Sequence, residues 1–126
     1  MTQRIATCAC GQVRVACSGE PLKVSLSHCR ECQRRSGGPF GIAAFFPRDA
    51  VAATGEMREF RRASDSGFDV VFRFCPDCGS TVWWEALRVP DRIAVASGAF
   101  ADPGFPAPTQ AVYREHRHGW LPEDLV

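Results

Sequence analysis

The chain has 126 residues, of which 45% are hydrophobic and 23% are charged, and its formal net charge is +1. This length and composition predict a single globular domain covering residues 1–126, and they exclude a chain too polar to bury a core. The near-neutral charge gives no indication of binding to nucleic acid or to an anionic membrane, and no apolar run is long enough to span a membrane.

The number of cysteines is the first unusual feature. The N-terminal residues MTQRIATC lack the apolar segment of a signal peptide, so we expect a cytoplasmic protein. Disulfides are rare in that compartment. The seven cysteines therefore need another explanation, and metal binding is the leading one.

Alternating apolar and polar residues predict short strands along the chain. In order, these runs contain Val13, Val15 and Cys17; Leu22, Val24 and Leu26; Phe68, Val70, Phe72 and Phe74; and Ile93 and Val95. Such alternation is typical of strands with one buried face. Turn-forming sequences separate the runs, and only residues 29–35 are expected to form a helix, of about two turns. The pattern indicates a mainly β domain of short antiparallel strands.

Six of the seven cysteines fall into three closely spaced pairs. They are CAC at Cys8 and Cys10, CREC at Cys29 and Cys32, and CPDC at Cys75 and Cys78. Structural zinc takes four ligands in a tetrahedral arrangement, so two pairs complete one closed site and the third pair is left over. The remaining cysteine, Cys17, continues the apolar face of its strand and is expected in the core.

The pair at Cys75 and Cys78 has the context of a zinc-binding hairpin. An apolar run enters the pair and a second β-rich segment leaves it. Gly79 supplies the backbone freedom needed where amides turn towards the sulfurs. In a redox-active pair the CxxC motif would lie at the start of a helix. Here a β-rich segment with two tryptophans follows, which does not favour that interpretation. Four thiolates would also suit iron. Spacing alone would join this pair to Cys29 and Cys32, which is the commonest arrangement of two CxxC pairs.

Three cysteine motifs, in this order, resemble those of the glutathione-dependent formaldehyde-activating enzyme family, whose domain also occurs in centromere protein V. The motifs are CxCGxV at 8–13, HCxxC at 28–32 and FCxxCGS at 74–80. The resemblance extends through GGPF at 37–40 to the WLP sequence at 120–122, and so covers nearly the whole chain. It implies a zinc-binding β-tent fold.

The resemblance also implies a division of the cysteines into two sites. Cys8, Cys10, Cys75 and Cys78 would hold a structural zinc, in place of the pairing that spacing suggests. The family's second site is catalytic and uses CxCxxC, with three thiolates and an open fourth position. Its last two thiolates match Cys29 and Cys32, but Ser27 stands at the first position. A serine hydroxyl is a much poorer zinc ligand than a thiolate, so occupancy of this second site is in doubt.

Five residues are candidates to complete the second site: Ser27, His28, His116, His118 and Cys17. His28 has the strand parity of Leu26, so it is also interpreted as a core residue. Without a third ligand, Cys29 and Cys32 would be free thiols.

The implied activity is that of a carbon–sulfur lyase acting on adducts of glutathione and formaldehyde, with zinc generating the thiolate. Arg30, Arg34 and Arg35 surround the thiol pair and are candidate ligands for the carboxylates of glutathione, although they equally suit the solvent face of the helix. The alternative is a non-catalytic zinc domain that binds a ligand or partner, its second metal site lost at Ser27. A third possibility is a thiol pair that senses aldehydes or oxidants.

Overall fold

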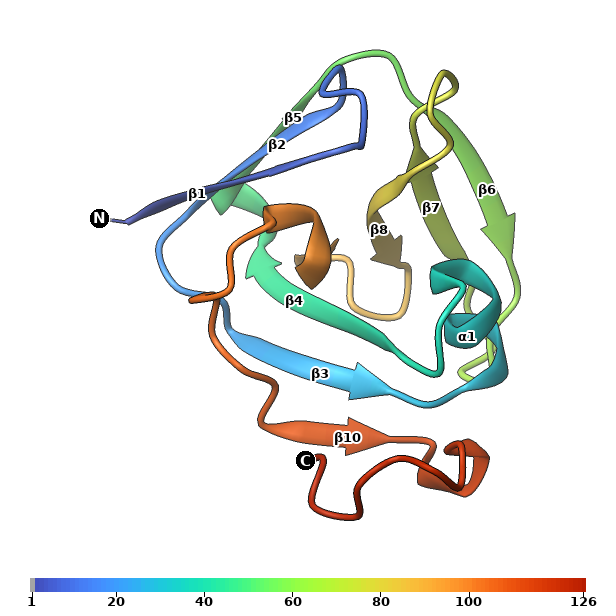
Figure 1. The fold of residues 1–126 in the computed structure, drawn as a ribbon. Helices are drawn as coiled ribbons and strands as arrows, with labels where there is room; N and C mark the ends of the chain where they lie inside the picture. Colours follow the sequence, from blue (N-terminus) through green and yellow to red (C-terminus); the bar gives the residue numbers. More distant parts are fainter. Residues whose placement is uncertain (1) are drawn as a thin grey trace.

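Ten short strands and one α-helix carry the fold in the computed structural model, which describes residues 2–126 (Figure 1). The strands are β1 Gln3–Thr7, β2 Arg14–Ser18, β3 Lys23–Ser27, β4 Gly41–Pro47, β5 Val51–Thr54, β6 Arg58–Arg62, β7 Val70–Phe74, β8 Thr81–Ala86, β9 Arg92–Ala96 and β10 Gln110–Val112. The helix α1 spans Arg30–Ser36, and three 3-10 turns lie at Arg48–Ala50, Ser97–Phe100 and Arg114–His116. The predicted mainly β fold with one short helix is confirmed. No helix within residues 2–126 is long and apolar enough to cross a membrane.

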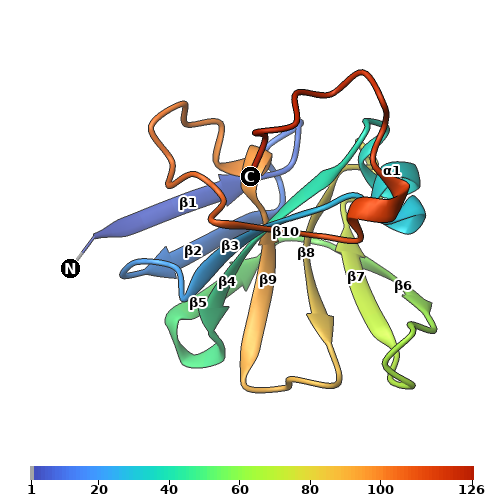
Figure 2. The same ribbon diagram turned by 90° about the horizontal axis from the view of Figure 1, so that it is seen from below.

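The strands form two sheets that share one core. The smaller sheet has the order β1-β2-β5 and the larger one the order β10-β3-β4-β9-β8-β7-β6. All pairings are antiparallel except that of β10 with β3. Figure 2 shows the strands of the larger sheet fanning apart towards one end. Side chains of both sheets meet in the core, where Val15 and Cys17 of the smaller sheet lie in one buried cluster with Phe46, Val82 and Val95 of the larger. The expected core position of Cys17 is confirmed.

Two of the predicted inward positions are wrong. Leu22 is 55% exposed and Phe68 is 53% exposed, because each lies just before its strand begins. The strict alternation also fails within β7, where the adjacent residues Val71 and Phe72 are both buried. Phe72 packs with Trp84 and Ala94 in a second small cluster, so this part of the sheet is covered on both faces.

Helix α1 connects β3 to β4 and begins at a cysteine. The side chain of Cys29 caps the helix by accepting a hydrogen bond from the backbone amide of Cys32, and Gly37 ends it in the left-handed conformation, with φ 72°. Gln33 ties the helix to the chain on either side. Its amide nitrogen donates to the carbonyl oxygens of His28 (2.8 Å) and His116 (3.1 Å). The helix thereby fixes both the entry to the thiol pair and the C-terminal segment that lies beside it.

Candidate functional site

Four cysteines from distant parts of the chain converge at one end of the sheets. The sulfurs of Cys8, Cys10, Cys75 and Cys78 all lie within 4.8 Å of one another. Cys8 follows β1, and the CPDC knuckle connects β7 to β8. The pairing that spacing alone favours, Cys75 and Cys78 with Cys29 and Cys32, is therefore wrong. Four thiolates at this separation could hold a metal ion, and their chemistry is compatible with zinc.

Backbone and side-chain donors point at the sulfurs of this cluster. The amide of Val13 donates to Cys8 Sγ (3.2 Å), that of Asp77 to Cys75 Sγ (3.4 Å), and Gln12 Nε2 also donates to Cys75 Sγ (3.1 Å). Gly79 has φ 79°, a conformation that favours glycine, and its amide closes the knuckle on the carbonyl of Cys75. Such donors stabilise negative sulfur and orient it towards an ion. The local geometry therefore fits a closed metal site.

The acidities of these thiols differ widely before any cation is bound. Hydrogen bonds from the hydroxyl and the backbone of Ser80 lower the pKa of Cys78 to about 5. The Gln12 backbone lowers the pKa of Cys10, but hydrogen bonds with Cys75 and Cys8 outweigh this and raise it to about 12. Burial raises the pKa of Cys75, but hydrogen bonds from the backbone of Cys78 and the side chain of Gln12 lower it below its ordinary value. Cys78 and Cys75 therefore ionise more readily than Cys10. Binding of a metal ion supplies the missing positive charge and releases protons, so metal affinity should fall as the pH falls.

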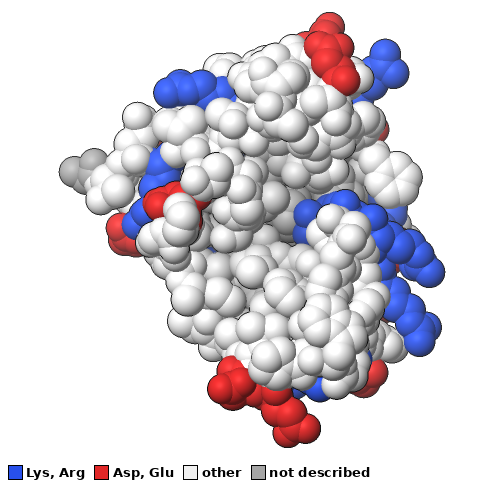
Figure 3. Space-filling model, viewed as in Figure 1, with Lys and Arg blue, Asp and Glu red and all other residues white. Residues whose placement is uncertain are grey.

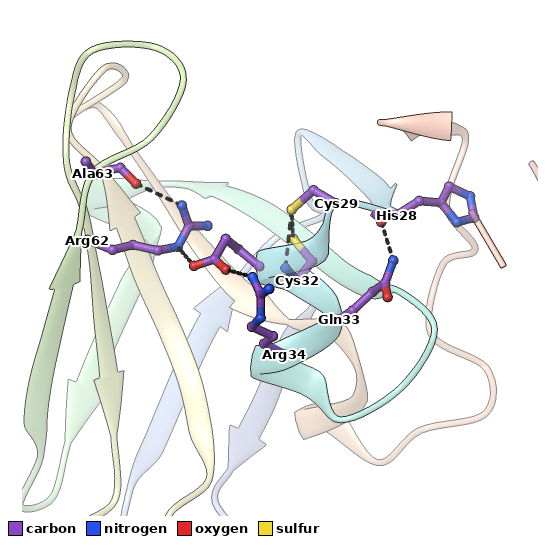
Figure 4. A network of polar contacts seen from close by, with 8 residues as sticks. His28, Cys29, Cys32, Gln33, Arg34, Arg62 and Ala63 are labelled. Carbon is purple, nitrogen blue, oxygen red and sulfur yellow. Dashed lines mark hydrogen bonds and ion pairs between the residues drawn. The ribbon is translucent and has the colours of Figure 1, made fainter. Parts of the chain in front are cut away.

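The second pair, Cys29 and Cys32, lies at the start of α1 (Figure 4) and does not belong to the first cluster. The two sulfurs are 3.0 Å apart, and the amide of Cys32 donates to Cys29 Sγ at 3.2 Å. Ser27 Oγ accepts from the amide of Cys29 at 3.3 Å, and Ser27 lines the same cleft as the two cysteines. Ser27 therefore occupies the corner next to the pair where a third ligand would stand.

The two thiols of this pair differ in acidity. Burial raises the pKa of Cys29, but the thiol of Cys32, the hydroxyl of Ser27 and the amide of Cys32 together lower it below its ordinary value, with help from the charge of Arg62. Burial raises the pKa of Cys32, and its hydrogen bond with Cys29 raises it further. Cys29 is therefore the thiol that ionises first.

Within residues 2–126, no histidine, cysteine or carboxylate completes a group of three with this pair. His28 is 1% exposed, packs its ring against Phe40 and points away from the two sulfurs (Figure 4), which confirms its interpretation as a core residue. Cys17 is in the core. The ring of His118 hydrogen-bonds to Gln33 (2.9 Å). His116 lines the cleft over the pair without joining it as a ligand.

The pair opens into a cleft of about 460 Å³. Its walls include Ser27, Arg30, Arg62, Asp65, Tyr113 and His116. Tyr113 donates from its hydroxyl to Asp65 Oδ2 (3.1 Å), which joins the C-terminal segment to the loop between β6 and β7. Tyr113 also has φ 55°, a strained conformation for a large side chain that is often found at functional sites.

The three arginines expected near the pair take different positions. Arg30 lines the cleft, whereas Arg34 and Arg35 line a neighbouring cavity. Arg34 is exposed and forms an ion pair with Glu31. Arg35 is half-buried and lies over the ring of Trp84, 4.2 Å from its centroid. Arg62 and Tyr113 also line the cleft, although nothing in their local sequence distinguishes them from surface residues.

We expect iodoacetamide to alkylate Cys29 faster than Cys32 or Cys17 at neutral pH, in protein dialysed against a mild chelator. The thiolate is the reactive form, and the pKa of Cys29 is lowered, whereas burial raises those of Cys32 and, to about 11, Cys17. Labelling of all three should slow as the pH falls, and the preference should be lost as the pH rises towards the raised pKa values of Cys32 and Cys17, where all three thiols ionise. Peptide mass spectrometry over a pH series measures it, and faster labelling of Cys32 would contradict it.

Comparisons with known proteins bear on the family and the fold. The model of the family described as glutathione-dependent formaldehyde-activating enzyme matches residues 3–116. Comparison with curated proteins finds no match. A crystal structure of a Rhodobacter sphaeroides protein has a similar fold, with a TM-score of 0.63 and 18% sequence identity, over 85% of this chain and 98% of that one.

Proposed function

Because the chain belongs to the glutathione-dependent formaldehyde-activating enzyme family, we propose that it catalyses the reversible addition of a small thiol, such as glutathione, to an aldehyde. This is the chemistry of a carbon–sulfur lyase. The observation that carries the proposal is the cleft over Cys29 and Cys32, which places an acidic thiol and a second sulfur beside open space of about 460 Å³. That space is sufficient for a small adduct.

The four-cysteine cluster has a structural role in this proposal. Cys8, Cys10, Cys75 and Cys78 would hold zinc and join the start of the smaller sheet to the β7–β8 hairpin of the larger. None of these four lines the cleft. The ion would therefore hold the walls of the site in place without meeting the substrate, as closed structural sites do.

The thiol pair would be the catalytic site, with Ser27 in the position of a third ligand. A zinc ion bound there would lower the pKa of an incoming thiol. Cys29 and Cys32 would orient that thiol, and Ser27 would bind metal more weakly than a thiolate does. Partial occupancy of this second site follows from the donor set.

The remaining groups in the cleft suit the other atoms of the reaction. As the sulfur of the thiol bonds to the carbonyl carbon, the π electrons of the carbonyl group move to its oxygen, which takes up a proton. The proton that the thiol loses balances the one that the oxygen gains. Tyr113 also lines the cleft, where its O–H donates to Asp65. Arg30, in the wall of the cleft, would attract a carboxylate of a thiol such as glutathione. In the reverse direction the C–S bond breaks and the thiol and aldehyde are released.

Turnover by the Cys32→Ala variant tests the proposal. We expect its rate of adduct formation to fall to that of the spontaneous reaction in buffer, because one of the two sulfurs of the site is lost. The thermal transition should stay close to that of the natural protein, since the structural cluster is untouched. The assay follows mixed thiol and aldehyde by NMR, corrected for the spontaneous rate, and Cys17→Ala serves as the control for loss of a cysteine outside the cleft.

Equal rates for the natural protein, Cys32→Ala and buffer would contradict an enzyme and favour the non-catalytic zinc domain. One observation supports this second function. The side chain beside the pair is that of Ser27, a weak metal ligand, and among residues 2–126 no stronger ligand completes the group. The domain would then use the same cleft to bind a ligand without turning it over.

A further inference from the structure

A second cavity of about 390 Å³ lies beside the thiol cleft, between α1 and strands β6 and β7. The two spaces share Glu31 and Arg62 in their walls, so they are neighbours separated by these side chains. Figure 3 shows basic side chains gathered over α1 at the edge of a hollow in this face. A ligand that occupied both spaces would pass beside Glu31 and Arg62.

The apolar part of this cavity is built from phenylalanines of the β6–β7 hairpin. Phe60, Phe72 and Phe74 line it, and Phe60 stacks on Phe72 with ring centroids 6.5 Å apart. Phe60 is nevertheless 57% exposed. An aromatic ring left uncovered at the wall of a cavity offers a flat surface on which another ring can stack.

The polar part of the cavity is formed by arginines that lie flat on aromatic rings. Arg35 lies 4.2 Å from the centroid of Trp84, and Arg62 lies 5.2 Å from that of Phe72. Stacking fixes a guanidinium group and leaves its N–H edge available for an anion. Within residues 2–126 no carboxylate pairs with Arg35, and the contact of Arg62 with Glu31 is long, at 3.9 Å.

The charges of the cavity do not cancel. Its walls carry the guanidinium groups of Arg34, Arg35 and Arg62 against a single carboxylate, that of Glu31. Arg34 pairs with this carboxylate at the exposed rim. The surplus positive charge lies towards Arg35 and Arg62, on the side nearer the thiol pair. An anionic group of a ligand is expected there.

We propose that this second cavity binds the aldehyde-derived part of the adduct, and that the substrate is a thiol adduct of an aromatic aldehyde that carries a carboxylate. The inference rests on the proposed function and names its substrate class. Formaldehyde contributes one carbon and would leave the cavity unfilled. An aryl ring would stack on Phe60, and its carboxylate would bind Arg35 and Arg62. The reaction itself is unchanged: a C–S bond forms, and the carbonyl oxygen takes up a proton.

Binding of unreactive probes tests the cavity without relying on turnover. Phenylacetate has a ring and an anion, acetate only the anion, and benzyl alcohol only the ring. We expect phenylacetate to bind at least about tenfold more tightly than either of the others, since each half contributes about 1.4 kcal/mol or more. Tryptophan fluorescence, sensitive to Trp84 beneath Arg35, and NMR titration measure the affinities.

Matched variants locate the bound probe. Phe60→Ala and Arg35→Gln should each weaken phenylacetate binding about tenfold. Phe68→Ala and Arg61→Gln are the controls, because both residues are exposed and lie outside the cavity. Equal affinities for the three probes, or binding that is unchanged in Phe60→Ala and Arg35→Gln when both remain folded, would overturn the proposal.

Turnover separates this inference from the proposed function. With glutathione as the thiol, 4-carboxybenzaldehyde should be converted at a higher kcat/KM than formaldehyde, and Phe60→Ala should reverse the preference. Conversion of formaldehyde alone would overturn the inference and leave the proposed function standing. Probe binding in the cavity without conversion of either aldehyde would overturn the proposed function, and with it the assignment of the cavity to an adduct.

Discussion

Cys78→Ala is expected to leave the chain largely unfolded or insoluble and without its tightly bound metal ion. Binding of zinc by a structural site contributes about 10 kcal/mol or more at neutral pH, which is comparable with the whole stability of a small domain, about 5–15 kcal/mol. Cys78 is exposed, so its replacement by alanine removes almost no packing. Loss of the fold would therefore come from loss of the ligand. Circular dichroism and metal analysis of the purified variant measure both.

The control for this experiment is Cys17→Ala, which removes a side chain from the core but no ligand of the proposed metal site. Cys17 is fully buried in the core but does not belong to the cluster, so its replacement should cost about 1 kcal/mol and leave the metal in place. A well-folded Cys78→Ala protein that keeps one zinc per chain would contradict the assignment of the cluster. A coloured protein would show that the bound metal is iron and not zinc.

Ser27→Cys is expected to raise the zinc content from fewer than two ions per chain towards two. The new sulfur would stand beside Cys29 and Cys32 in the wall of the same cleft, giving the three protein ligands of an open zinc site. The substitution replaces oxygen by sulfur and adds little volume, so the fold should tolerate it, although Arg35 already fills the space beside Gly41, the residue opposite Ser27 on β4. Zinc per chain after dialysis against a mild chelator measures the gain.

Ser25→Cys is the matched control for this gain. It makes the same substitution two residues earlier on β3, opposite Ala43, where the side chain hydrogen-bonds to Gln110 and not to the thiol pair. Its zinc content should stay that of the natural protein. A gain in both variants would indicate adventitious binding to an added thiol. Two firmly held ions in the natural protein would show that the hydroxyl of Ser27 suffices or that His116 moves to complete the site.

The strands were predictable from the sequence where one face alone is buried. Val15 and Cys17 follow this rule on β2, and the helix begins beside Cys29 as expected. The rule fails at β7, because Val71 and Phe72 are both covered by other parts of the fold. Periodicity reports the burial of a strand by a single layer, and it carries no information about a second layer supplied from elsewhere in the chain.

The assignment of the cysteines shows a different limit. Spacing favours joining Cys75 and Cys78 to the other CxxC pair, whereas the structure brings them to Cys8 and Cys10. Which pair joins Cys75 and Cys78 depends on how the two sheets pack together in the fold, and no local sequence pattern contains that information. The family resemblance indicated the right pairing because the family's metal site already reflects the folded arrangement of the sheets. It could not indicate Arg62, which reaches the cleft from β6 through tertiary structure alone.

The convergence of Cys10 with Cys75, 65 positions later in the chain, also has a consequence for synthesis. While the protein is being made, the first two cysteines of the proposed metal site leave the ribosome long before the last two exist. During that interval they are ordinary thiols on an incomplete nascent chain, open to oxidation or to capture by the wrong metal. Closing so long a loop also costs entropy that the ion must offset. Metal supply should therefore limit the yield of folded protein in cells at the moment when residue 78 emerges.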